Sequence, residues 1–152
     1  METSMWLRFS LYLACLLMSC GASAAEILTA VCGPLQGYVL GVGGASDVYK
    51  PIEQRDGMSG QTTIVWEIGS SEAQIIAQGQ VGGSPMLEKA VVTLSTKDQV
   101  SFVVIYPVSV FLYSLFPQRN ALLLSRHTHQ RGFDFDAARM LALHGPCTIR
   151  IK

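Results

Sequence analysis

The stretch QVSFVVIYPVSVFLYSLFPQRNALLLSRHTHQ, residues 99–130, decides the fold class of this chain. Its three apolar runs are separated by short turn signals, Pro107-Val108 and Pro117-Gln118-Arg119. Runs rich in β-branched and aromatic residues, bounded by proline and polar residues, are typical of strands joined by tight connections. The pattern therefore predicts three consecutive antiparallel strands.

Similar runs lie on both sides of this stretch, and we expect each of them to form a strand. They are LQGYVLGVGG (35–44), QTTIVWEIG (61–69), AQIIAQGQV (73–81), KAVVTLS (89–95) and ARMLALHG (138–145). Residues 45–60 contain Pro51, Gly57 and Gly60 and show no sustained period, so we expect a long loop there. The sequence thus predicts an all-β antiparallel meander of about eight strands.

Some of the expected strands are apolar on both of their alternating faces, as in FVVIY (102–106) and ALLL (121–124). Such strands are covered on both sides, or meet a core on one side and a partner or ligand on the other. Closing the sheet removes its exposed edges, so we expect a closed or nearly closed barrel. A short C-terminal helix is an alternative for residues 134–145, because Asp134 or Asp136 could cap it.

The N-terminal segment predicts export. Arg8 precedes the uncharged apolar run Phe9–Cys20, and the small residues of Ala22–Ala25 follow, which is the pattern of a signal peptide cleaved after Ala24. The run is shorter than the roughly 20 residues of a membrane span, and no later segment is long enough. Residues 25–152 would then form one β-barrel domain in a bacterial periplasm or outside the cell. Alternatively, LMSCG (17–21) resembles a lipobox, which implies a lipid anchor on Cys20 and an outer-membrane lipoprotein.

Two cysteines remain in the predicted mature chain, Cys32 and Cys147, one near each end. In an oxidising compartment an even pair most simply forms a disulfide. A redox-active pair is the alternative, but the C-x-x-C spacing is absent. We therefore expect a structural bond that brings the first and last strands together.

Charge and motifs exclude several classes of function. The chain has no net charge, and its Lys and Arg residues are scattered, whereas a nucleic-acid-binding surface needs a basic stripe. There is no complete G-x-S-x-G and no H-E-x-x-H motif, and GVGGAS (41–46) lacks the third glycine of a dinucleotide-binding loop. We therefore expect neither an enzyme nor a cofactor.

The pair His127 and His129 could form half of a metal site, because alternate residues of a strand share a face. If residues 120–129 and 138–146 form a hairpin with His129 opposite Ala138, then His127 lies opposite Met140 and His144 lies about 13 Å farther along. One ion cannot bridge that distance, so a third ligand would have to be Asp134 or Asp136 from the loop, or come from another chain. We expect a polar strand end rather than a dedicated site; a metal-dependent enzyme built on these residues is the less favoured alternative.

The aromatic residues have two interpretations. They can fill the core of a small barrel, or some of them can line an interior pocket for an apolar molecule. We take Trp66, Tyr106 and Tyr113 as candidate ligand-binding residues, to which Met86, Met140 and Leu141 could contribute.

The chain resembles small exported bacterial proteins with a signal peptide and one cysteine near each end, on the stretches VCGPLQGYVLG, TTIVWEIG, SFVVIYPVSVFLYSLF and HGPCTI. It is also similar in general character to periplasmic lysozyme inhibitors, although Ser59-Gly60 is not followed by the tyrosine of their inhibitory loop. Taken together, the sequence predicts an exported, non-enzymatic β-barrel that binds a small apolar ligand or an envelope partner. The alternative is a protein-binding inhibitor or envelope accessory module.

Overall fold

The computed structural model describes residues 24–43, 51–78, 84–131 and 136–152. Apart from a short 3-10 turn at Pro117–Arg119, their regular structure is β-strand. The strands are β1 (Ile27–Cys32), β2 (Leu35–Gly43), β3 (Pro51–Met58), β4 (Thr62–Glu67), β5 (Glu72–Ala77), β6 (Met86–Ser95), β7 (Val100–Tyr106), β8 (Ser109–Phe116), β9 (Ala121–Arg131) and β10 (Asp136–Ile151). In the described ranges there is no helix with the length and hydrophobicity required to cross a bilayer.

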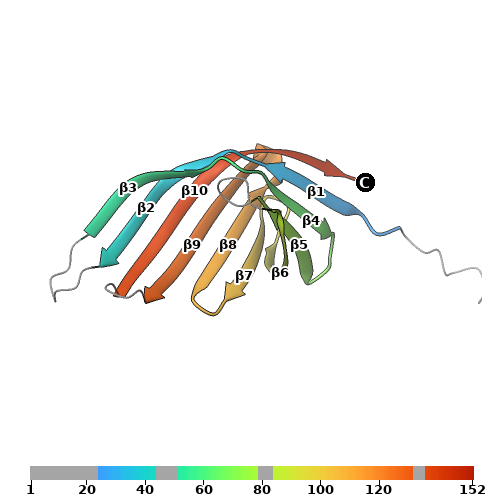
Figure 1. The fold of residues 1–152 in the computed structure, drawn as a ribbon. Coiled ribbons are helices and arrows are strands. Elements are labelled where there is room, and N and C mark those ends of the chain that lie inside the picture. The colour runs from blue at the N-terminus through green and yellow to red at the C-terminus, as the bar shows by residue number, and fades with distance from the viewer. Residues whose placement is uncertain (1–23, 44–50, 79–83, 132–135) are drawn as a thin grey trace, which may run out of the picture.

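The strands form one antiparallel sheet that closes on itself. Its order is β1-β4-β5-β6-β7-β8-β9-β10-β2-β3, and β1 also pairs with β10. That additional pairing closes eight strands into a barrel, while β2 and β3 continue the sheet beyond it (Figure 1). The predicted all-β antiparallel barrel is therefore confirmed.

The long strand β10 is where the barrel closes and where the extra strands branch off. One edge of β10 pairs with β9. The other edge pairs with β2 over residues 137–144 and with β1 over residues 147–151. Because β1 and β2 lie end to end along the same edge, the sheet forks at their junction: β4 follows β1, whereas β3 follows β2.

The fork requires glycine at two places. Gly33, next to a cis bond to Pro34, has a φ of 130°, a conformation that side chains with a Cβ rarely adopt. On β10, a Cβ at Gly145 would lie 2.6 Å from both the Pro34 carbonyl oxygen and a methyl group of Leu35. The chain therefore passes close to β10 where it changes from one branch of the sheet to the other.

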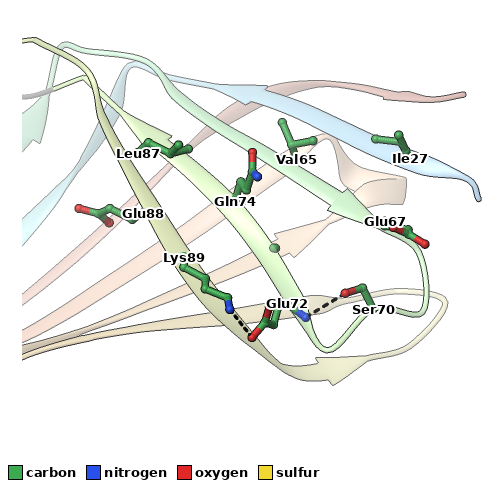
Figure 2. A pocket seen from close by; sticks show the side chains of 10 residues that line it. Ile27, Val65, Glu67, Ser70, Glu72, Gln74, Leu87, Glu88 and Lys89 are labelled. Carbon is green, nitrogen blue, oxygen red and sulfur yellow. Dashed lines mark hydrogen bonds and ion pairs between the residues drawn. The ribbon is translucent and has the colours of Figure 1, made fainter.

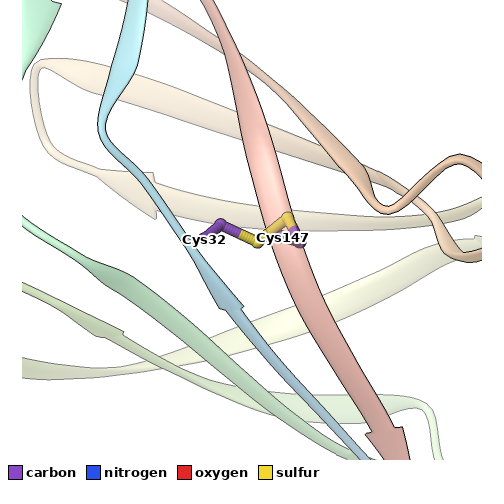
Figure 3. Close-up of a disulfide and its surroundings, with 2 residues drawn as sticks. All are labelled: Cys32 and Cys147. Atoms are coloured by element: carbon purple, nitrogen blue, oxygen red, sulfur yellow. A yellow bond between two sulfur atoms is a disulfide. The ribbon is translucent and has the colours of Figure 1, made fainter.

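The disulfide predicted between Cys32 and Cys147 is present at this seam. The two cysteines are directly opposite each other in the β1–β10 pairing, and Figure 3 shows their bond joining the adjacent strands. Both side chains belong to the buried core. The bond therefore fixes the last pairing needed for closure.

One local prediction is wrong, and one alternative is excluded. Residues 51–58, expected to be loop, form β3, whose pattern is weak because it pairs with β2 alone among the described strands. Residues 136–145, for which a helix was an alternative, belong to the 16-residue strand β10. The helix propensity of the Ala and Leu residues is outweighed there because β10 has a paired strand on each edge. Pairing therefore satisfies its backbone hydrogen-bonding groups on both sides. Residues 134 and 135, and the predicted signal segment up to residue 23, lie outside the described residues.

The barrel interior is a packed apolar core over much of its length. Residues that alternate along each strand point inward, and the largest fully buried ones include Phe102, Ile64, Ile75, Leu115, Leu122 and Leu124. On the outer face of β7 and β8, the hydroxyls of Ser101 and Ser114 are buried and hydrogen-bond to each other at 3.1 Å. The core is filled by side chains around Phe102, Leu115 and Leu122, and the remaining space lies beside Tyr106, Phe111 and Arg126.

Candidate functional site

A cavity of about 550 Å³ is lined by residues of β3, of β5 to β10 and of the β7–β8 turn. This volume lies within the range of about 300–1,000 Å³ that is usual for small-molecule sites. Its apolar and aromatic walls come from six elements, and they include Met58, Met86, Tyr106, Phe111, Tyr113 and Leu141. We call it the mouth cavity.

Three aromatic rings form one wall of the mouth cavity. Phe111 is stacked on Tyr113, with ring centroids 6.2 Å apart, and meets Tyr106 edge to face at 5.3 Å. Tyr113 is almost fully buried, whereas Tyr106 and Phe111 are half-buried. The wall is therefore packed into the core at Tyr113, whereas the ring of Tyr106 is partly exposed and can contact a ligand.

Arg126 brings a positive charge to the same wall. It is opposite Phe111 in the β8–β9 pairing, and its guanidinium lies 5.6 Å from the centre of the Phe111 ring. An arginine over an aromatic face is stabilised by the ring quadrupole. Two residues before it, Leu124 is buried in the core, so Arg126 marks the position on β9 where the interior face becomes polar.

Glu88 brings a carboxyl group to the cavity from β6. It is opposite the fully buried Ile75 of β5, which places it on the interior face. One of its oxygens, Oε2, is buried and has no hydrogen-bond partner among the described residues. Burial raises the pKa of the Glu88 carboxyl, since removing a charge from water disfavours the ionised form.

These groups are close enough to influence one another. Burial raises the pKa of the Tyr113 phenol, the Glu88 carboxylate raises it further, and Arg126 lowers it. Within the described residues, however, Glu88 and Arg126 form no ion pair with each other. The mouth cavity thus contains an arginine and a carboxylic acid that are not neutralised by direct contact.

A second hollow, of about 540 Å³, lies on the outer face of β1, β4, β5 and β6. Figure 2 shows Lys89 and Glu72 in an ion pair there, 2.7 Å apart, with Glu88 turned away from the other labelled side chains. Both charged groups are more than half exposed, and such pairs contribute little. Because this ion pair is largely exposed to water, and the other residues that line the hollow include further acidic side chains, this hollow offers less to an apolar ligand than the mouth cavity does.

The structure brings together two of the three candidate ligand-binding residues. Tyr106 and Tyr113 line the mouth cavity, along with Met86 and Leu141. Trp66 is placed in the packed core, where it meets Phe102 edge to face and its indole N–H donates to the Ser70 carbonyl oxygen at 2.9 Å. Trp66 is therefore held by structural contacts, and it is absent from the cavity lining.

The predicted pairing of the histidine-bearing strands is confirmed. His129 is opposite Ala138, His127 is opposite Met140, and His144 is opposite Leu123. His127 is exposed, and the His129 side chain lies outside the described residues. Among the side chains that are described, no three His, Cys, Asp or Glu residues form a group that could hold a metal ion.

Arg126 and Glu88 were missed by sequence reasoning, although a signal for both is present. In the run that begins at Ala121, the interior positions are Leu122, Leu124 and then Arg126, so a charge occupies a face that is otherwise apolar. Glu88 likewise shares its face with the buried Ala90. A charged residue in phase with core residues therefore indicates where the packed interior gives way to a cavity.

Comparison with known protein families, with curated proteins and with solved structures finds no significant match to this chain. Its function is therefore argued from the geometry of the barrel and of the mouth cavity.

The Glu88→Gln variant is expected to be slightly more stable than the wild type near neutral pH, by less than about 1 kcal/mol, because solvent screens the partly exposed carboxyl. The folded-state pKa of Glu88 is raised, so protonation favours folding. That contribution is complete below the unfolded pKa and is lost as the pH rises through the folded pKa. Urea unfolding at about pH 4 and about pH 7 measures the difference.

Glu72→Gln is the matched control, because Glu72 lies on the neighbouring strand but is exposed on the outer face. Its stability should differ little from that of the wild type. A Glu88→Gln effect of the same size at both pH values would contradict the assignment of a desolvated, titrating carboxyl.

Proposed function

We propose that this protein is an exported, non-enzymatic β-barrel that binds a small, largely apolar molecule in the mouth cavity. The observation that carries the proposal is a cavity walled by the Tyr106–Phe111–Tyr113 ring cluster, at the end of a barrel whose remaining interior is packed. Pockets with apolar walls and a few polar groups are typical of ligand sites. The disulfide is compatible with the oxidising compartment that export to the periplasm would provide.

A Tyr106→Ala variant should bind decanol, used here as an uncharged apolar probe, about ten-fold more weakly than the wild type. The Tyr106 ring is half-buried at the open end of the aromatic wall, so its loss removes ligand contact with a smaller effect on the core than loss of Tyr113. Isothermal titration calorimetry gives the affinity, and thermal unfolding gives the accompanying change in stability.

Tyr38→Ala is the matched control, because Tyr38 is an exposed tyrosine on the outer face of β2. It should leave decanol binding unchanged. Equal affinities in the Tyr106→Ala variant and the wild type would count against a binding site in the mouth cavity.

A second candidate function, binding of an envelope protein, is favoured by apolar side chains exposed on the outside of the barrel. On the adjacent strands β6 to β9 they include Val91, Ile105, Val110, Leu112 and Leu123, and Leu40 is exposed on β2. Ile105 and Val110 are directly opposite each other, and their exposed fractions are 73% and 40%. Contiguous exposed apolar side chains are a feature of protein interaction surfaces.

Native mass spectrometry of the protein recovered from its own envelope, followed by denaturing mass measurement, separates the two functions. A small mass lost on denaturation supports ligand binding, and a bound polypeptide supports the accessory function. The bare chain alone would oppose both. The denatured mass also reports cleavage after Ala24 or a lipid on Cys20.

A further inference from the structure

The arginine of the mouth cavity has a charge that the described protein groups leave without an anionic partner. Of the described lining residues, Arg126 is the only cationic one. Its guanidinium has a ring contact with Phe111, but it forms no ion pair within the described part of the chain. Arginine stays protonated at all physiological pH values and presents a planar set of donors. Those donors are available to an acceptor that enters the cavity.

The two carboxyl groups of the cavity compete weakly for these donors. Asp56 accepts a hydrogen bond from the backbone N–H of Gly57 at 2.7 Å. Glu88 is partly desolvated, and this favours its neutral form. To the extent that Glu88 is protonated, it does not repel an anion, and its hydroxyl can donate a hydrogen bond. Neither carboxyl group forms an ion pair with Arg126 among the described residues, so the guanidinium donors remain open to an anionic ligand.

We infer that the molecule bound in the mouth cavity is an amphiphilic carboxylic acid, with its carboxylate on Arg126 and its hydrocarbon part against Met58, Met86 and Leu141. Arginine binds carboxylates through two parallel hydrogen bonds, a geometry that is stronger and more specific than a contact with a neutral hydroxyl. Methionine side chains adapt to apolar chains of varied shape. This inference rests on the proposed function, because it names the class of ligand for the same cavity.

The test compares three probes with the same chain and different head groups: decanoic acid, decanol and decylamine. Calorimetric titration of the delipidated protein at neutral pH should show decanoic acid binding about ten-fold or more tightly than decanol. Decylamine should bind more weakly than decanol, because its cation would be repelled by Arg126. In the Arg126→Gln variant the preference for decanoic acid over decanol, measured as the ratio of the two affinities, should disappear.

Two further variants keep the test decisive. Arg126→Lys retains the charge without the planar donor set and should retain part of the preference. Arg150→Gln removes an exposed arginine of β10 at the closed end of the barrel and should change nothing. Retained decanol binding also shows that each variant is folded.

The outcomes separate this inference from the proposed function. Equal binding of decanoic acid and decanol by the wild type, a preference for decylamine, or an acid preference that survives Arg126→Gln would each overturn the inference and leave the cavity as a binding site. Failure of all three probes to bind would overturn the proposed function as well.

Discussion

Replacing both Cys32 and Cys147 by alanine should lower the free energy of unfolding by about 2–5 kcal/mol. The disulfide joins residues that are 115 positions apart, so its loss frees almost the whole described chain in the unfolded state. In the chain-entropy description the stabilisation grows with the length of the closed loop. The bond also lies on the β1–β10 pairing, which is the pairing that completes the barrel. Urea unfolding followed by circular dichroism measures the change.

The control for this experiment is the reducing agent. The wild type should lose a similar amount of stability when a thiol reductant is present, whereas the double variant should be insensitive to it. A loss of less than about 1 kcal/mol in the double variant would contradict the role of the bond as the tie that closes the barrel.

Replacing Phe102 by alanine should cost about 3–5 kcal/mol, an effect as large as that of losing the disulfide. Phe102 has 0% exposure and packs edge to face against Trp66, with the ring centroids 6.2 Å apart. Its truncation would leave a hole surrounded by side chains from both sides of the barrel. Interiors packed to crystal-like density relax only partly around such a hole.

Phe111→Ala is the matched control, because Phe111 belongs to the next strand and also faces inward, but it borders the mouth cavity. Part of its surface is already free, so its loss should cost less than half as much. Equal losses for Phe102→Ala and Phe111→Ala, measured by the same denaturant unfolding, would mean that the end of the barrel near Phe111 is as tightly packed as its centre.

The confirmed sequence predictions depend on the alternation of apolar and polar residues along each strand and, for the disulfide, on the chemistry of paired thiols. The interior positions Leu122 and Leu124 on one strand and Leu141 and Leu143 on the next are in phase, and this limits the β9–β10 register to steps of two residues. A strand shifted by one residue would turn all of these leucines to solvent. The separation of His127 and His144 was derived from an assumed hairpin with this phase, and the observed pairing matches the assumption.

The candidate site was only partly predictable. Tyr106 and Tyr113 were proposed from a set of aromatic residues that could either fill the core or line a pocket, and both border the mouth cavity. Arg126 and Glu88 were not found, because a charge on a strand normally faces solvent and only the neighbouring strands show that these two do not. Trp66 had the same sequence signal as the tyrosines, yet its indole N–H meets the Ser70 carbonyl within a packed layer.

The sequence by itself determined the strand-rich class, the phase of most strands and the pairing of Cys32 with Cys147, because each follows from nearest-neighbour alternation or from thiol chemistry. Only the tertiary structure decided that β10 exchanges β2 for β1 along one edge, that residues 51–58 become a strand, and that Arg126 and Glu88 reach one cavity. The physical reason is the difference in sequence separation between the interactions involved. Alternation fixes the face on which a side chain lies, whereas the partner of each strand edge is chosen by contacts between segments far apart in the chain.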